Sequence, residues 1–381
     1  MENFTVYNPT RVHFGRDIIS GFGKTVSEYG ENVLLVYGKG SVKKNGIYDK
    51  VLAELLPYSL NIIEFGGIKP NPVIDDVNKA ADIASVNNID VVLAVGGGSV
   101  IDSAKIIALC TPEKPDAWDV MKGRVKPSKS LPLINILTLA ATGTEMNPYS
   151  VLQNHKTHEK IGYGNELMYP AHSYLDPQFT FSVSPEYTAY GIIDLIAHAM
   201  ESWFGKGEAS LSDRFVAAII KEAMYYAPLV LKEPRNYDYR ANILWASTCA
   251  LNGLTSYGRR SADWGVHDVG HILSYLYDMP HGATLSIAYP AWLKLQSDRI
   301  PDRIRKLGMQ IFGINTVKET ISRLERFFQS VDCPVRLSNT GIGKNKKEEI
   351  TSLLIKNSAT GFNHSLSEDD HRMIVDYMLL D

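Results

Sequence analysis

The most informative stretch of the sequence runs from Val91 to Ser99 and reads Val-Val-Leu-Ala-Val-Gly-Gly-Gly-Ser. A short, wholly apolar run predicts a strand that is buried on both faces. The three glycines lead into a helical pattern over residues 100–109. Such a turn leaves N–H groups uncovered at a helix start, and glycine lets an anion come close to them. The stretch predicts a phosphate-binding strand–turn–helix unit, although a tight turn without a ligand would have the same sequence.

The same alternation extends on both sides of this stretch. Further apolar runs that end in glycine or polar turns lie at residues 33–37, 60–65 and 133–139. After Pro185 the pattern changes to apolar spacings of three and four, at residues 187–204, 212–231, 239–254 and 316–331. We therefore expect an α/β dinucleotide-binding, Rossmann-like domain over residues 1–185 and an all-α domain over residues 186–381.

Composition excludes several functional classes. The 381 residues carry a formal charge of −3, so no positive excess favours nucleic-acid binding. The three cysteines are too few and too widely spaced for a disulfide framework or a cysteine-based zinc site. No signal peptide and no apolar run of about 18 residues is visible. These features predict a cytoplasmic protein without a membrane or nucleic-acid partner.

The turn Gly38-Lys39-Gly40-Ser41 follows the first apolar run, where a dinucleotide fold usually meets the adenosine ribose. An acidic residue there would accept a hydrogen bond from the ribose of NAD and repel the 2′-phosphate of NADP. This turn offers Lys39 and Ser41 instead, so it predicts NADP(H) in preference to NAD(H). The alternative is that Lys39 is a solvated surface lysine that does not contact the cofactor.

The second half contains candidate metal ligands. Asp194 and His198 are four residues apart in a predicted helix that begins at Ser184-Pro185, so both lie on one helical face. His267 and His271 repeat this spacing, and His281 follows in a segment that we expect to form a turn. One carboxylate with three imidazoles suits a divalent transition metal with an open coordination position. Spacing alone does not show that these groups meet.

Together these motifs resemble the iron-containing, or group III, alcohol dehydrogenases, and most closely the NADPH-dependent butanol dehydrogenase and aldehyde reductase branch. The resemblance covers nearly the whole chain. It rests on the ordered motifs at residues 65–72, 96–105, 137–145, 175–177, 194–198 and 267–282.

The resemblance implies an active site in a cleft between the two domains, and it gives roles to individual residues. It implies that Asp194, His198, His267 and His281 bind one divalent metal ion, Fe(II) or Zn(II). His271 matches a histidine near the nicotinamide that is not a ligand. The positions expected to hold the cofactor are Gly38, Lys39, Gly40, Ser41, Asn71, Gly96, Gly97, Gly98, Ser99, Asp102, Thr138, Leu139, Thr142 and Lys160.

The activity implied is reversible hydride transfer between NADP(H) and a short-chain aldehyde or primary alcohol, with the metal polarising the substrate oxygen. His271 is the candidate proton donor, or else a residue that only orders its neighbours. A homodimer is expected because relatives are commonly dimers. Two alternatives are a polyol oxidoreductase similar to glycerol dehydrogenase and a nucleotide-binding protein that has lost catalysis.

Overall fold

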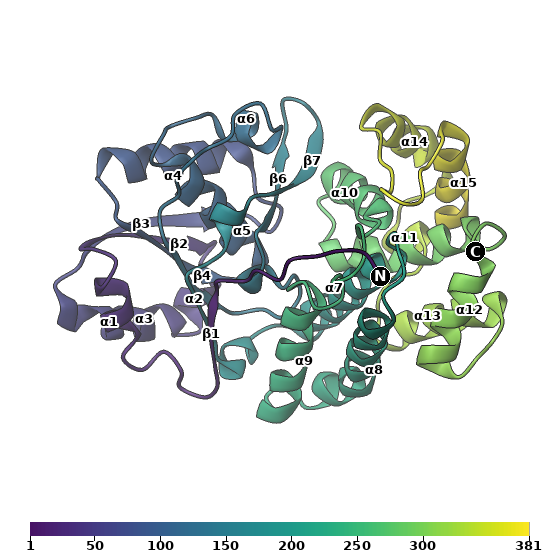
Figure 1. Ribbon diagram of the computed structural model, residues 1–381, viewed down its shortest axis with the longest axis horizontal. Helices are drawn as coiled ribbons and strands as arrows, with labels where there is room; N and C mark the ends of the chain where they lie inside the picture. Colours follow the sequence, from purple (N-terminus) through teal and green to yellow (C-terminus); the bar gives the residue numbers. More distant parts are fainter. Residues whose placement is uncertain (381) are drawn as a thin grey trace. The chain divides into compact units, whose positions relative to one another are not determined.

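The structure is a computed structural model that describes residues 1–380. The chain forms two compact units (Figure 1). One unit comprises Tyr7–Val183. The other comprises Met1–Val6 together with the chain from Ser184 onward.

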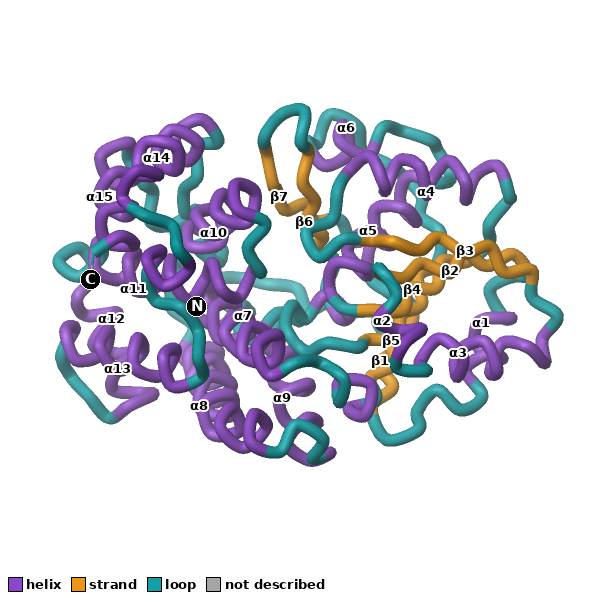
Figure 2. Tube along the Cα trace, turned by 180° about the vertical axis from the view of Figure 1, so that it is seen from behind, coloured by secondary structure: helices purple, strands orange, loops and turns teal. Residues whose placement is uncertain are grey.

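The first unit is built on a six-stranded sheet in which every neighbouring pair of strands is parallel. Its strands are β1 (Arg11–Phe14), β2 (Asn32–Gly38), β3 (Asn61–Ile68), β4 (Val91–Gly96), β5 (Leu133–Leu137) and β8 (His172–Leu175). Helices α1 (Phe22–Ser27) and α3 (Ile47–Leu55) lie on one face, and α4 (Ile74–Val86), α5 (Gly98–Cys110) and α6 (Ala117–Met121) lie on the other (Figures 1 and 2). Because both faces are covered, all six residues of β4 are buried. The predicted α/β class is confirmed.

The order of the strands places the two glycine turns side by side. The order is β1-β8-β5-β4-β2-β3, so β3 lies on one side of β2 and β4 lies on the other. The chain therefore adds β3 on one side of β2 and then crosses over to add β4 on the other side, so the strand order changes sense between β2 and β4. Tyr37 pairs with Val95 in register, so both strands end at the same edge. Open α/β sheets bind ligands at such a switch point, outside the carboxyl ends of the strands.

Several strands of this unit were not predicted: β1 and β8 of the main sheet, and a separate hairpin. Strands β6 (Tyr149–Asn154) and β7 (Glu159–Gly164) form an antiparallel two-stranded sheet. Their residues are mostly polar, and the four residues between them include no glycine, so neither a hydrophobic run nor a short hairpin turn marks them. Strand β5 also ends at Leu137, two residues before the end of the predicted run.

The second unit is helical, as predicted. Its helices are α7 (Pro185–Trp203), α8 (Ser210–Lys232), α9 (Tyr237–Ala250), α10 (Gly265–Tyr277), α11 (His281–Leu295), α12 (Pro301–Phe312), α13 (Val317–Ser330), α14 (Lys347–Lys356) and α15 (Glu368–Leu379). The Ser184 hydroxyl accepts the N–H of Tyr187 and caps α7, which begins at Pro185 as expected. Helices α7 and α11 form the core and are joined by the Tyr289 hydroxyl, which donates to the carbonyl of Ala197 at 3.2 Å. Among the described residues, no helix combines the length and apolar character that crossing a bilayer requires.

Candidate metal centre and cofactor turns

The triple glycine forms the predicted turn between β4 and α5. Gly97 precedes the helix, and Gly98 is its first residue. A methyl group on Gly98 would lie 2.7 Å from both Cγ2 and Oγ1 of Thr142, so any other residue type would require Thr142 or the turn to shift. The helix start has no side-chain cap and no acidic residue in its first turn. Its N–H groups and helix dipole thus suit an anion.

The turn after β2 has the expected character. Gly40 has φ of 120°, a value that favours glycine, and it precedes the short helix α2 (Ser41–Lys44). Lys39 and Ser41 are both exposed. The nearby carboxylate of Glu64 is engaged by the Lys43 ammonium at 3.2 Å and by the hydroxyls of Tyr37 and Tyr48.

The remaining predicted cofactor residues lie in the same unit, and several are already hydrogen-bonded to one another. The buried Lys160 ammonium donates to Asn71 Oδ1 at 2.8 Å. Asp102 accepts from the Thr144 hydroxyl at 2.6 Å and from the N–H of Val151 at 2.9 Å. Ser99 donates to the carbonyl of Pro70, Thr138 donates its N–H to Gly96, and Leu139 lies next to Gly97.

Lys105 is a residue of this site that the sequence reasoning left without a role. It is fully buried on α5, and its ammonium donates to the Thr144 hydroxyl, to both oxygens of Asn147 and to the carbonyl of Tyr149, at 2.7–3.1 Å. Burial lowers the pKa of Lys105 to about 7, and the negative charge of Asp102 opposes this shift. Lys105 therefore fixes the segment after β5 to the helix that follows the glycine turn.

Three helices of the second unit supply the predicted metal ligands. Asp194 and His198 lie one turn apart on α7, His267 lies on α10, and His281 is the first residue of α11. His281 was expected in a turn, and this is corrected: the turn ends at Pro280, which precedes the helix.

The donor atoms of these residues gather around Asp194 Oδ1. This oxygen lies 3.5 Å from His198 Nδ1, 4.0 Å from His267 Nε2 and 3.8 Å from His281 Nε2. Ligands about 2.1 Å from a tetrahedral metal lie about 3.4 Å from one another, so these separations suit one ion. Asp194, His267 and His281 form a group whose donor atoms all lie within 4.8 Å of one another, whereas His198 approaches Asp194 without joining that group.

The donor set is compatible with a divalent transition metal. Asp194, His198 and His267 are buried. His198 Nδ1 has no hydrogen-bond partner among the described residues. Burial, together with the neighbouring His267, lowers the pKa of His198 well below its usual value, so the ring is neutral. A neutral imidazole is the form that binds a metal.

Glu201 is a second residue that the sequence reasoning missed. It lies on α7 and is buried, and its Oε1 accepts from His267 Nδ1 at 2.7 Å. Burial raises the pKa of Glu201, whereas hydrogen bonds from backbone N–H groups at the start of α10 lower it and favour the ionised form. The signal was available, because Glu201 follows Asp194 by seven residues and so shares its helical face.

His271 and Trp264 complete the surroundings of the ligands. The His271 ring is buried, and its centroid lies 5.3 Å from that of His281. The Trp264 ring lies 5.2 Å from His267 and 6.1 Å from His198, measured between centroids. Trp264 therefore gives His198 and His267 an apolar, aromatic neighbour.

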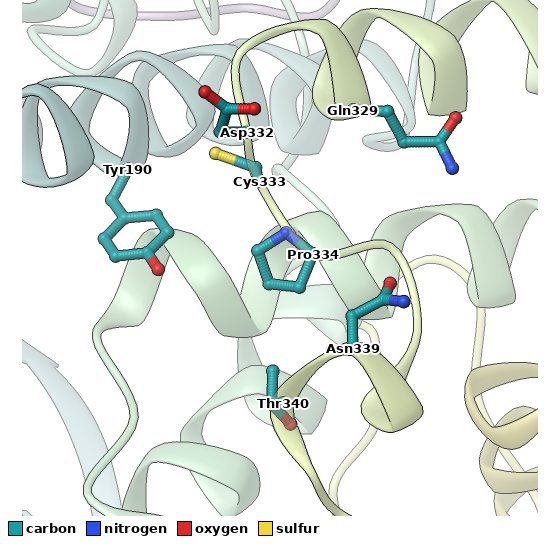
Figure 3. A pocket seen from close by; sticks show the side chains of 7 residues that line it. All are labelled: Tyr190, Gln329, Asp332, Cys333, Pro334, Asn339 and Thr340. Carbon is teal, nitrogen blue, oxygen red and sulfur yellow. The ribbon is translucent and has the colours of Figure 1, made fainter.

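A separate cavity of about 460 Å³ lies in the helical unit (Figure 3). The residues that line it are Tyr190, Gln329, Asp332, Cys333, Pro334, Asn339 and Thr340, and none of the predicted ligands is among them. Burial raises the pKa of the Cys333 thiol to about 12, so the thiol stays protonated.

Family models match both parts of the chain. Residues 9–177 match the model for iron-containing alcohol dehydrogenase, and residues 188–375 match the model for the C-terminal part of the same family. The chain belongs to the iron-containing alcohol dehydrogenase family. It is thus a metal-dependent oxidoreductase, and the resemblance drawn from its motifs is confirmed.

Relatives of this dehydrogenase align over almost their whole lengths. It is 38% identical to the probable NADH-dependent butanol dehydrogenase 1 of Bacillus subtilis, covering 97% of this chain and 98% of that protein. It is 34% identical to the NADPH-dependent aldehyde reductase of Escherichia coli, covering 98% and 99%. The crystal structure of NADH-dependent butanol dehydrogenase A of Thermotoga maritima superimposes with a TM-score of 0.96 at 35% identity, covering 100% of this chain and 99% of that one.

Proposed function

We propose that the chain is an NADP(H)-linked alcohol dehydrogenase and aldehyde reductase that acts on short-chain primary alcohols and aldehydes. The observation that carries the proposal is the convergence of three imidazoles on the carboxylate of Asp194. Such a buried centre would suit a dehydrogenase whose metal acts on the oxygen of the carbonyl group at which the nicotinamide exchanges hydride.

In this proposal the two domains expected from the sequence bind different groups. Residues 1–185 bind the cofactor, and residues 186–381 bind the metal. The cofactor would lie over the glycine turns after β2 and β4, because these turns flank the switch point of the sheet. The uncapped start of α5 suits its pyrophosphate.

The preference for NADP(H) rests on the turn after β2. Lys39 and Ser41 are exposed there, and the nearby carboxylate of Glu64 is already engaged by three donors. A 2′-phosphate would therefore meet a cation and a hydroxyl rather than an uncompensated acid. The names of the relatives include both NADH-dependent and NADPH-dependent enzymes, so the preference needs a direct measurement.

At the metal centre, Asp194, His198, His267 and His281 would hold one Fe(II) or Zn(II) ion. Either ion, when bound, supplies a Lewis acid that polarises a carbonyl group. The protein contributes the fixed positions of the ligands and a buried, water-poor setting. Trp264 provides an aromatic surface beside the ligands, which suits an aliphatic substrate better than a polyol.

His271 is the proposed proton donor. Its ring is buried beside His281, but it stands outside the group of donor atoms around Asp194. Replacing it by asparagine should lower kcat while the metal content stays unchanged. Unchanged turnover in that variant would remove His271 from the reaction.

The deciding experiment compares NADPH and NADH consumption with aldehydes of two to six carbons, with and without a chelator. We expect turnover with NADPH, loss on chelation and recovery when Fe(II) or Zn(II) is returned. Glycerol with oxidised cofactor is the polyol comparison, and efficient glycerol oxidation would contradict the proposed substrate class. Light scattering on the purified protein tests the proposed homodimer.

A further inference from the structure

The buried carboxylate of Glu201 contacts the ring of His267, one of the proposed metal ligands. Glu201 is 1% exposed and lies on α7, three residues after His198 and seven after Asp194. Residues at these spacings share one helical face. One face of α7 thus carries two proposed ligands and the carboxylate that contacts a third.

This carboxylate accepts hydrogen bonds from both the backbone and the side chain of α10. Its Oε1 accepts the His267 N–H at 3.1 Å and His267 Nδ1 at 2.7 Å, and its Oε2 accepts the Trp264 N–H at 2.6 Å. Trp264 precedes α10 and provides no side-chain cap. Glu201 therefore caps a helix other than its own, where a negative charge is favoured by the helix dipole.

The bond to the side chain determines which ring nitrogen of His267 faces Asp194. The backbone N–H groups of Trp264 and His267 favour the ionised form of Glu201. An ionised carboxylate has only acceptors, so its bond with the His267 ring requires the proton of neutral His267 to sit on Nδ1. The lone pair is then on Nε2, the atom that lies 4.0 Å from Asp194 Oδ1. The backbone bonds on either side hold the start of α10 and the ring in one orientation.

We propose that Glu201 is a positioning residue that pre-orients His267 for the metal and raises the basicity of its Nε2. The inference rests on the proposed ligand set, because His267 must be a ligand for the orientation to matter. Carboxylate–histidine–metal arrangements of this kind typically change metal affinity by 10–100-fold when the carboxylate is removed.

The test uses metal-free full-length protein and measures Zn(II) affinity by competition with a chromophoric chelator. We expect Glu201→Gln to raise the Kd for Zn(II) by about 10–100-fold. The absorption bands of the Co(II)-loaded variant should also shift, because the ligand field at His267 changes. Glu325→Gln is the matched control: Glu325 lies on α13, pairs with Lys294 and Arg336, and touches none of the ligands.

The outcomes separate this inference from the proposed function. If Glu201→Gln melts at a lower temperature but keeps the affinity and the Co(II) spectrum of the wild type, Glu201 only caps α10 and the inference is overturned. If the wild type itself binds no metal, or if Asp194→Ala binds as tightly as the wild type, the proposed ligand set fails instead.

A second measurement covers the case in which Glu201→Gln does not fold. In zinc-loaded wild-type protein with ¹⁵N-labelled histidine, the signals that disappear in His267→Gln belong to His267. We expect them to report a protonated Nδ1 and a metal-bound Nε2. A metal-bound Nδ1 would overturn the inference.

Discussion

The Lys105 ammonium lies 2.7 Å from the hydroxyl of Thr144, inside the first unit and away from solvent. The same ammonium also donates to the carbonyls of Asn147 and Tyr149. A single lysine of α5 therefore holds the chain that runs from the turn after β5 into β6.

Removing this ammonium should loosen that segment. We expect Lys105→Met to lower the free energy of unfolding by about 1–3 kcal/mol or more, because buried acceptors lose their donor. NADPH affinity, measured by fluorescence titration, should fall as well. Lys122→Met is the control, because the partly exposed pair of Lys122 with Glu159 is worth at most about 1 kcal/mol. Equal effects of the two substitutions would contradict the role given to Lys105.

Gly98 tests the contact between the glycine turn and Thr142. An alanine there would place Cβ 2.7 Å from two atoms of Thr142, so the Thr142 side chain or the turn must shift. We expect Gly98→Ala to raise the KM for NADPH by at least about tenfold, since a displacement of about 1 Å is enough to misplace a bound group. Gly162→Ala is the comparison, because its nearest neighbour, Val151, would be 3.9 Å away. A KM for NADPH that stays at the wild-type value in Gly98→Ala would exclude phosphate binding at this turn.

Cofactor selectivity should depend on Lys39, which is exposed at the end of β2. We expect Lys39→Asp to lower kcat/KM for NADPH relative to NADH by about 10–100-fold, because an acid there repels the 2′-phosphate and can accept from a ribose hydroxyl. Lys44→Asp, at the end of the short helix α2 that follows this turn, is the control for a general change of charge. If both variants shift the ratio equally, the effect is long-range electrostatics and not a contact.

Acid stability should depend on Asp213 in the helical unit. Burial opposes its ionisation, but hydrogen bonds from Arg303, Lys306 and Arg259 prevail and hold the pKa of Asp213 well below its usual range. A depressed pKa gives stability that is complete above the unfolded value of about 3.9 and is lost as the pH falls below it.

Asp213→Asn should therefore cost about 3–5 kcal/mol at pH 7, because it leaves the buried Arg259 guanidinium without its charged partner and also removes the pairs with the more exposed Arg303 and Lys306. The difference in free energy of unfolding between the variant and the wild type should become smaller as the pH falls below about 4. Urea unfolding at pH 7, 5 and 3.5 measures both quantities. A gap that is independent of pH would show that the charge of Asp213 is not the source of the stability.

Much of the fold follows from patterns that the sequence displays. The buried strands β2, β4 and β5 and the start of α7 at Ser184-Pro185 carry local signals, namely apolar runs and a cap. The hairpin of β6 and β7 carries none, because its stability comes from contacts such as the bond of Asp102 with Val151 rather than from its own residues.

The candidate site also has one part that the sequence predicts and another that only the packing of the helices determines. Helical periodicity puts Asp194 and His198 on one face, but only the packing of α10 and α11 on α7 brings His267 and His281 to them. The role of Lys105 was missed because, in a sequence, a buried charged residue looks the same as an exposed one. For Glu201 the spacing from Asp194 indicated the helical face, but neither its burial nor its partner on α10. Burial of such a group is decided by hydrogen-bond partners that lie 39 to 66 residues away along the chain.

The first six residues of the chain belong to the helical unit, where the Glu2 N–H donates to the carbonyl of Gly258 at 2.9 Å and Phe4 stacks on Tyr257. The polypeptide thus passes from one unit to the other twice, after Val6 and after Val183. A single proteolytic cut at either crossing leaves the two halves covalently tethered. Releasing the sheet unit as a free fragment requires two cuts, and the helical remainder would then consist of two peptides held together only by contacts such as these.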